Sequence, residues 1–410
     1  MTNTRKPTVL TDLPLELLLM ISDHLSVVDI ACLALCNYHL MASFIDTKSA
    51  FDNFSKRRII DLNDAVRIEF MTRLAHDLPP YYLCFGCLRL HRWWNIELPG
   101  PHFDFLNLPK CFKPLSYNDR YGHRRRALEL EYYPSYTRCQ LHFVHVQLAM
   151  RRFYCGPRFG LKAESFFSTE VAIHSLENGT LGPIANEKPH DNIMTTLTSI
   201  EARICPAPSP GLCVRAQELA VVRRQNVSQL RPKLKAGYMR TCGHMSTILP
   251  DFWQIMDPLL DRFSSDSAPT HVSDQGRCRK CNTSWKLELR DVGPGDACLV
   301  LTKWMDLGPG LSPEDPRWLC HLSTIPRVSL ADDELVSDPQ ARFERDSIQA
   351  TKADALSDEE MFNRNMSLLR RHEYQINMTK VGRSRWFLNA EEAKKREQTK
   401  KREISRCIIL

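Results

Sequence analysis

The chain has 410 residues, 43% of them hydrophobic, and a formal net charge of +7. This length and apolar content are enough for two or three domains with a substantial core. No apolar run reaches the ~18 residues of a membrane-spanning helix, and the first residues lack the apolar stretch of a signal peptide. The sequence therefore predicts a globular protein made in the cytosol, and its scattered basic residues argue against a nucleic-acid binder.

The first predicted elements are two short helices within residues 11–40. Leu13-Pro14 gives a stiff entry to the first helix, and Ser26 can cap the second, with Asp29 three residues further on. The first helix carries apolar residues at helical spacing: Leu17, Leu18, Ile21 and Leu25. The second carries a similar stripe: Ile30, Leu33 and Ala34. Two helices in ~30 residues cannot bury this much apolar surface alone, so we expect them to dock on another surface.

This segment resembles the F-box. The Leu-Pro opening and the sequences ELLLMISDHL and VVDIACLAL stand where that family has its first two helices. The resemblance implies binding to the adaptor subunit of SCF ubiquitin ligases through Leu13, Pro14, Leu17, Ile21, Leu25, Ile30 and Leu33. The family's usual Val-Ser-Arg-x-Trp/Phe is replaced by LCNYH at residues 35–39, so no contacts are carried over to a third helix. The alternative is an ordinary helical hairpin that packs on its own domain.

The chain divides by composition into further segments, and the overall prediction is an α+β fold. Residues 8–50 are assigned to the F-box and residues 51–80 to a helical connector that ends at Pro79-Pro80. Residues 81–330 are rich in cysteine and proline and are expected to form a mixed domain that recruits a target. Within it we expect a helix over 143–153 and strands over 212–222, 285–292 and 297–304.

The last part of the sequence is charged. Residues 331–360 hold ten acidic and three basic residues, which predicts a solvated linker. Residues 361–410 are expected to form a basic helical tail. The chain ends in Cys407-Ile-Ile-Leu, a CaaX pattern whose leucine favours geranylgeranyl attachment at Cys407. With the preceding basic residues, prenylation would bring the protein to a membrane; the alternative is a chance cysteine at the terminus.

Closely spaced cysteines and histidines form the candidate metal ligands. Fifteen cysteines in a chain without an export signal are expected to be mostly reduced, so such pairs favour zinc over disulfides. Cys84 and Cys87 flank a tight turn, with Gly86 expected to ease the backbone. Three further groups complete the set of candidates: His91, the pair Cys242 and His244, and the pair Cys278 and Cys281.

The spacing leaves the partners of each ion open. Our first hypothesis joins the last four of these ligands around one ion: Cys242, His244, Cys278 and Cys281. Cys84 and Cys87 would then be completed by His91, or by Cys139 and His142. The competing hypothesis is one site built from both CxxC pairs, and the simplest alternative is that these are buried reduced cysteines that pack as small hydrophobes. A zinc ion with four protein ligands would stabilise the fold and do no catalysis.

The order of these motifs extends the resemblance over residues 8–325, to F-box proteins of filamentous fungi with CxxC motifs. Five segments carry it after the F-box: YYLCFGCLRLHRW, HFVHVQLAMRRFYCGPRFGL, CGH, CRKCNTSWKLEL and LTKWMDLGPGLSPEDPRW. The resemblance implies a substrate receptor that joins the SCF adaptor, and through it the cullin, to an unknown protein target. Such a protein would act in the cytoplasm or nucleus, or at a membrane if Cys407 is prenylated.

No signature of catalysis is present. The sequence lacks GxGxxG, GxxxxGK[ST], HExxH and GxSxG, which argues against nucleotide-binding, metalloprotease and hydrolase classes. We therefore expect a non-catalytic subunit. The alternatives are a zinc-dependent nucleic-acid-binding or transcriptional regulator, although the paired histidines of DNA-binding fingers are missing, and an F-box scaffold that never joins a ligase.

Overall fold

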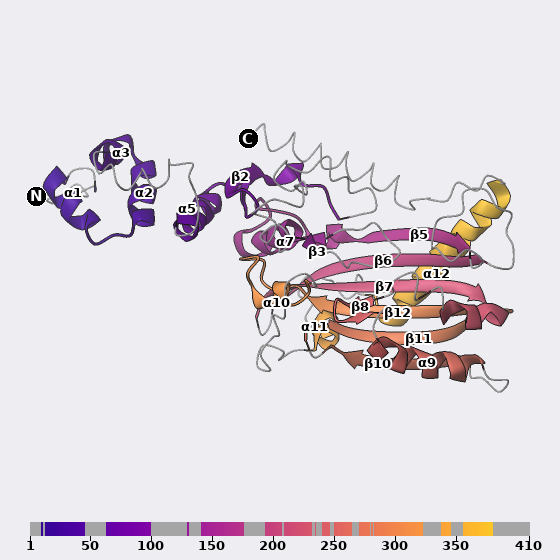
Figure 1. Ribbon diagram of the computed structural model, residues 1–410. Coiled ribbons are helices and arrows are strands. Elements are labelled where there is room, and N and C mark those ends of the chain that lie inside the picture. Colours follow the sequence, from indigo (N-terminus) through magenta and orange to yellow (C-terminus); the bar gives the residue numbers. More distant parts are fainter. Residues whose placement is uncertain are drawn as a thin grey trace, which may run out of the picture. The chain divides into compact units, whose positions relative to one another are not determined.

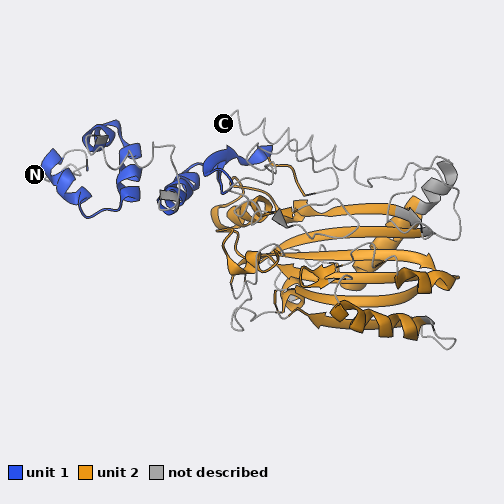
Figure 2. Ribbon diagram, viewed as in Figure 1, with its two compact units in different colours: residues 1–95 blue, residues 96–410 orange. Residues whose placement is uncertain are grey.

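The structure is a computed structural model that divides the chain into two compact units, residues 1–95 and residues 96–410 (Figure 2). We call them unit 1 and unit 2 and describe each by itself. The described residues are 10, 13–45, 63–99, 129–130, 141–175, 193–206, 209–231, 234, 240–246, 250–264, 270–278, 280–281, 283–322, 338–345 and 356–379. The unit boundary lies after Asn95, so residues 81–95, assigned from composition to the second domain, belong to the first unit.

Unit 1 is mostly helical. Its helices are α1 (Leu15–Ser22), α2 (Val27–Cys36), α3 (Tyr38–Ile45) and α5 (Asn63–Asp77), and they are followed by the hairpin β1 (Tyr81–Cys84) and β2 (Arg89–Arg92) and the short helix η2 (Trp93–Asn95). The predicted cap of α2 is confirmed, because the Asp29 N–H donates to Ser26 Oγ and the Ser26 N–H donates to Asp29 Oδ2, each over 3.1 Å. The core of the first three helices is small: Leu18, Ala34, Leu40 and Phe44.

Unit 2 is built on a six-stranded antiparallel sheet in the order β10-β11-β12-β7-β6-β5 (Figure 1). The strands are β5 (Ser168–Ser175), β6 (Ile193–Cys205), β7 (Gly211–Arg223), β10 (His271–Arg277), β11 (Thr283–Gly293) and β12 (Asp296–Asp306). Two three-stranded meanders, β5-β6-β7 and β10-β11-β12, are joined where β12 pairs with β7. The α+β class and the three predicted strands are thus confirmed.

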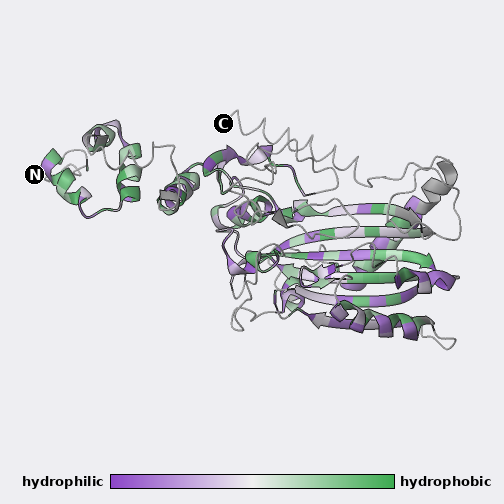
Figure 3. Cartoon of the chain, viewed as in Figure 1, coloured by the Kyte–Doolittle hydropathy of each residue, from purple (hydrophilic) through white to green (hydrophobic). Residues whose placement is uncertain are grey.

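Helices cover both faces of this sheet, and the alternation of side chains along the strands explains how. On β12, Leu299 and Leu301 point to the face that packs against α9 (Pro250–Ser264), with Met256 and Phe263 of that helix in the same core. The residues between them point to the opposite face. There Cys298 and Val300 share a core with three side chains of α12 (Asp358–Thr379): Phe362, Met366 and Leu369. Both faces of β12 are therefore buried, and the strand is largely hydrophobic along its length (Figure 3).

The remaining elements are β3 (Glu129–Leu130), β4 (Leu141–His142), α7 (Phe143–Cys155), η5 (Ala163–Phe166), η6 (Arg224–Gln229), β8 (Arg240–Cys242), β9 (Met245–Ser246), α10 (Pro316–Leu319) and α11 (Pro339–Arg345). Most of them lie near the end of the sheet where β7 begins, whereas η6 follows β7 at the other end. The helix expected over 143–153 is confirmed as α7. Within the described ranges, no helix is long and apolar enough to cross a membrane.

The predicted linker over residues 331–360 is wrong for the part that the structure describes. Arg342 and Phe343 of α11 are buried, and Arg342 Nη1 lies 2.5 Å from Asp306 Oδ2 of β12. Asp358, at the start of α12, forms an ion pair with the buried Arg215 over 3.0 Å. Charged residues of this segment, one basic and one acidic, therefore form ion pairs with the sheet. Residues 361–379 are helical as expected, but they belong to α12, which packs on the sheet and is not a separate tail; Cys407 lies outside the described residues.

Candidate metal centre

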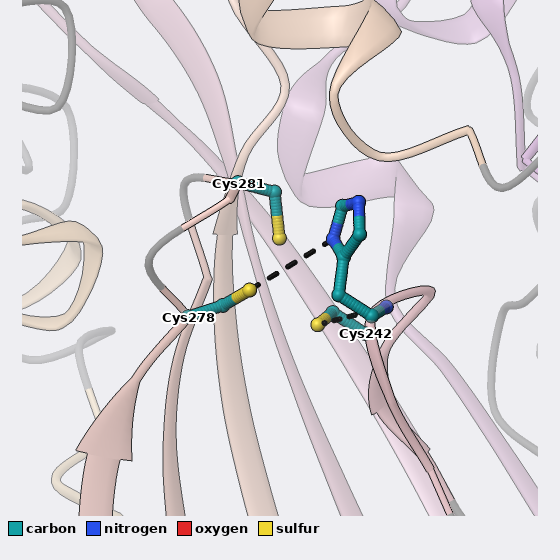
Figure 4. A group of neighbouring side chains, drawn as sticks. Cys242, Cys278 and Cys281 are labelled. Carbon is teal, nitrogen blue, oxygen red and sulfur yellow. Dashed lines mark hydrogen bonds between the residues drawn. The ribbon is translucent and has the colours of Figure 1, made fainter. Parts of the chain in front are cut away.

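Two tight turns bring four metal-ligand side chains together in unit 2. Cys242 ends β8 and His244 lies in the turn before β9, while Cys278 and Cys281 occupy the connection between β10 and β11. The sulfur atoms of the three cysteines point toward one another (Figure 4). All four ligand atoms lie within 4.8 Å of one another. The first hypothesis drawn from the spacing, one ion shared by these four residues, matches this grouping.

The distances fit a tetrahedral ion. An ion held about 2.3 Å from sulfur and about 2.1 Å from nitrogen places its ligand atoms about 3.6–3.8 Å apart. Cys278 Sγ lies 3.8 Å from His244 Nδ1, which is the length of one edge of such a tetrahedron. The set of three thiols and one imidazole is also the donor chemistry of structural zinc sites. The four side chains can therefore hold a metal ion with little rearrangement.

Backbone hydrogen bonds in both turns point at the sulfurs. The N–H of His244 donates to Cys242 Sγ, and the N–H of Lys280 donates to Cys278 Sγ, each over 3.4 Å. Such bonds favour the ionised form of a thiol, which is the form that binds metal. The CxH and CxxC spacings thus serve to place a backbone donor beside each ligand.

Without a cation, the three thiols compete for one negative charge. Hydrogen bonds from the thiols of Cys242 and Cys281 lower the pKa of Cys278. In return, the hydrogen bond to Cys278 raises the pKa of Cys242 to about 12, and the bond to Cys242 raises the pKa of Cys281. Only one of the three buried sulfurs therefore ionises readily by itself, and a bound cation would remove this competition.

A buried shell surrounds the four ligands. Cys320, 1% exposed, packs in the same cluster, and its thiol donates to the carbonyl of Arg317 over 3.3 Å. Thr283 Oγ1 lies 3.3 Å from Cys281 Sγ and 3.5 Å from Nδ1 of the buried His321. Spacing in the sequence did not identify Cys320 or His321, because these adjacent residues have no further cysteine or histidine near them at metal-binding spacing.

A second, smaller group lies in unit 1. Cys84 ends β1, Cys87 follows in the turn, and His91 lies in β2, with Cys87 Sγ 3.1 Å from His91 Nε2. These three ligand atoms also lie within 4.8 Å of one another. Gly86 was expected to relieve the backbone of this turn, but the residue with positive φ is Leu88, at 53°.

The two groups answer part of the pairing question. Cys278 and Cys281 have Cys242 and His244 as their neighbouring ligands. This grouping argues against one site built from both CxxC pairs. Cys84 and Cys87 lie beside His91, the ligand named in one of our alternatives. Cys139 lies outside the described residues, and His142 is buried at the start of α7, where the pKa of its ring is lowered to about 4 by burial.

The predicted adaptor-binding residues are divided between the surface and a local core. Pro14, Leu17 and Ile21 are exposed, the two aliphatic side chains by 44% and 40%. The other four are partly buried: Leu13, Leu25, Ile30 and Leu33. Three of these four pack against the core around Leu18, which the sequence had placed in the same stripe as Leu17. The outward face of α1 therefore consists of Leu17, Ile21 and their neighbours.

Comparisons of the chain with protein-family models, with curated proteins and with solved structures find no match.

Proposed function

We propose that this chain is the substrate receptor of an SCF-type cullin-RING ubiquitin ligase. The proposal rests on the F-box resemblance of residues 8–50, and one observation carries it further. Among the described residues ten large hydrophobic side chains are exposed, and eight of them lie between Leu10 and Tyr38. A soluble domain does not gather its exposed apolar side chains in one segment unless that segment binds a partner.

The composition of this surface fits a protein partner. Its most exposed side chains are large: Leu15, Met20, Leu35 and Tyr38. Burying each one in an interface would contribute roughly 1.5–3 kcal/mol, so a few of them are enough for a specific complex. Unit 2 would then present the target, and ubiquitin transfer would be accelerated by proximity while other subunits supply the chemistry. In this function the chain itself is not a catalyst.

Zinc is the ion that we propose for the four-ligand site. The two turns that supply the ligands lie about 35 residues apart in the sequence, so one ion would join β8 to the β10-β11 hairpin. No ligand position would remain open for water, and the ion would stabilise the fold of unit 2. The three-ligand group of Cys84, Cys87 and His91 is the second proposed zinc site.

Adaptor binding tests the receptor proposal. We would measure binding of the full chain to the SCF adaptor by pull-down and calorimetry, with Leu17→Asp and Ile21→Asp as variants. Both side chains are exposed, so the charge should remove the contact without unfolding α1. Leu311→Asp is the matched control, because Leu311 is 65% exposed in unit 2. Failure of the wild-type chain to bind, or equal binding by all three variants, would refute the proposal.

A further inference from the structure

A pocket of about 700 Å³ opens beside the end of β6 in unit 2. Its walls come from segments that are distant in the sequence: the end of α7, the loop around η5, residues 201–204 of β6, and Arg364 of α12. The volume lies within the range of ligand-binding pockets, roughly 300–1,000 Å³. None of the candidate metal ligands lines it, so it is a separate site.

The strand pairing explains why the pocket exists. β5 begins at Ser168, which pairs with Ile200, whereas β6 runs on to Cys205. In the part of the chain that the structure describes, no strand pairs with residues 201–205 on the β5 side. The preceding segment forms the 3-10 helix η5 instead of extending β5. Beyond Ile200, β6 is therefore flanked on this side by η5 instead of a strand, and the pocket opens between the η5 loop, β6 and the end of α7.

Positive charge exceeds negative charge around the pocket. The lining has four cationic side chains, Arg152, Lys162, Arg203 and Arg364, and two carboxylates, Glu164 and Glu201.

Glu201 is already shared by three guanidinium groups. Its carboxylate oxygens lie 2.8 Å from Arg215, 3.2 Å from Arg364 and 3.8 Å from Arg203. Lys162 forms no ion pair within the described ranges. An entering anion would thus meet cations whose charge is not fully compensated.

Two of these cations are held in place by aromatic rings. The guanidinium of Arg203 lies 4.5 Å from the centre of the Phe343 ring, and that of Arg364 lies 4.6 Å from the centre of the Phe167 ring. Burial lowers the pKa of both arginines, which shows that their charge is poorly solvated. Groups fixed in this way lose little freedom when they bind an anion, and they can form paired hydrogen bonds to its oxygens.

We propose that this pocket binds an extended segment of another protein that carries an anionic side chain, either phosphorylated or acidic. The cations would hold the anionic oxygens, and the walls formed by α7, the η5 loop and β6 would enclose the residues on either side of the anion. Phe153, Phe167 and Ile204 supply apolar contacts for the neighbouring side chains. The identification of this segment as part of a ubiquitination target rests on the proposed function, whereas the binding itself does not involve the adaptor.

Synthetic peptide pools test the pocket with the full chain. Twelve-residue pools with random flanks would carry phosphoserine, glutamate or alanine at the centre, and binding would be measured by fluorescence anisotropy. The wild-type chain should bind at least one anionic pool about tenfold more tightly than the alanine pool, and the preferred pool identifies the anion. Lys162→Glu and Arg203→Gln should each remove this preference, with thermal melting to check that both variants fold.

Arg223→Gln is the matched control, because this half-exposed arginine lies at the other end of β7. Equal binding of the alanine pool, or an unchanged preference in Lys162→Glu, overturns the proposal. The proposal is also overturned if single-stranded oligonucleotides or phosphatidylserine vesicles displace the peptide and their own binding is lost in Lys162→Glu. Adaptor binding is measured separately. If the chain selects anionic peptides but does not bind the adaptor, the receptor function is refuted and the peptide-binding pocket is still supported.

Discussion

Lys303 Nζ lies 2.7 Å from Glu218 Oε1 in the middle of the sheet, and each side chain is only 1% exposed. The two residues lie on the neighbouring strands β12 and β7, where Glu218 stands opposite Leu301. Lys303 also donates to the carbonyl of Arg240 in β8, over 2.8 Å. Since β8 ends in Cys242, this one ammonium group connects the core of the sheet to the strand that carries a proposed metal ligand.

Breaking this buried ion pair is expected to destabilise unit 2 strongly. Glu218→Leu leaves the Lys303 ammonium buried without its carboxylate, which should lower the free energy of unfolding by about 3–5 kcal/mol. Adding Lys303→Met removes the uncompensated charge, so the double variant should recover most of the loss. Urea denaturation of the three proteins measures these differences. Additive effects of the two substitutions would show that the pair is not coupled.

Phe343 tests whether residues 338–345 are part of the folded unit. The side chain is fully buried beside Cys205, Cys213 and Trp304, so Phe343→Ala should cost about 3–5 kcal/mol in urea denaturation. Glu344→Ala, at the exposed neighbour, should change stability by less than about 0.5 kcal/mol. Equal stability of the two variants would restore the interpretation of this segment as a linker.

Metal analysis tests the four-ligand site. The purified wild-type chain should contain zinc, and Cys281→Ser should contain about one ion less per chain because a tetrahedral site loses a ligand. Cys320→Ala is the control, since Cys320 packs in the same cluster without belonging to the four-ligand group. Chelation should lower the melting temperature of the wild type and of Cys320→Ala. Metal-free protein with an unchanged melting temperature would rule out a structural zinc ion.

The stability of unit 2 should fall in mild acid because of buried histidines. Burial lowers the pKa of His145 to about 3 from 6.5, and its ring donates from Nε2 to the carbonyl of Glu97 over 2.9 Å. Between these two pKa values the unfolded state binds a proton that the folded state does not, so the free energy of unfolding decreases as the pH falls from 6.5 toward 3.

His145→Gln isolates this contribution. The variant should be less stable than the wild type at pH 7 but should lose less stability between pH 7 and pH 4, by at most about 1.4 kcal/mol per pH unit. His321, whose pKa is also lowered by burial, remains in both proteins and cancels in the comparison. Urea denaturation at several pH values provides the measurement. If the free energies of unfolding of the wild type and of His145→Gln change with pH by the same amount, His145 does not take up a proton on unfolding.

Local patterns predicted local structure well. Ser26 with Asp29 marked the start of α2, and the apolar runs around Leu219, Leu287 and Val300 marked central strands, because caps and strand alternation depend on neighbours in the sequence. The segment around Phe343 was misread for the same reason. Its charged composition is typical of a solvated linker, and the partners of its ion pairs, Asp306 for Arg342 and Arg215 for Asp358, come from distant strands.

The sequence by itself determined the helical start, the α+β class and the residue types that can bind metal, since spacing limits which ligands share a turn. Only the tertiary structure decided that Cys242 and His244 meet Cys278 and Cys281, and that Lys162, Arg203 and Arg364 line one pocket. These groupings depend on which strands pair and where β5 stops. Strand pairing is a long-range choice made by the packing of the whole sheet, and no local pattern in the chain encodes it.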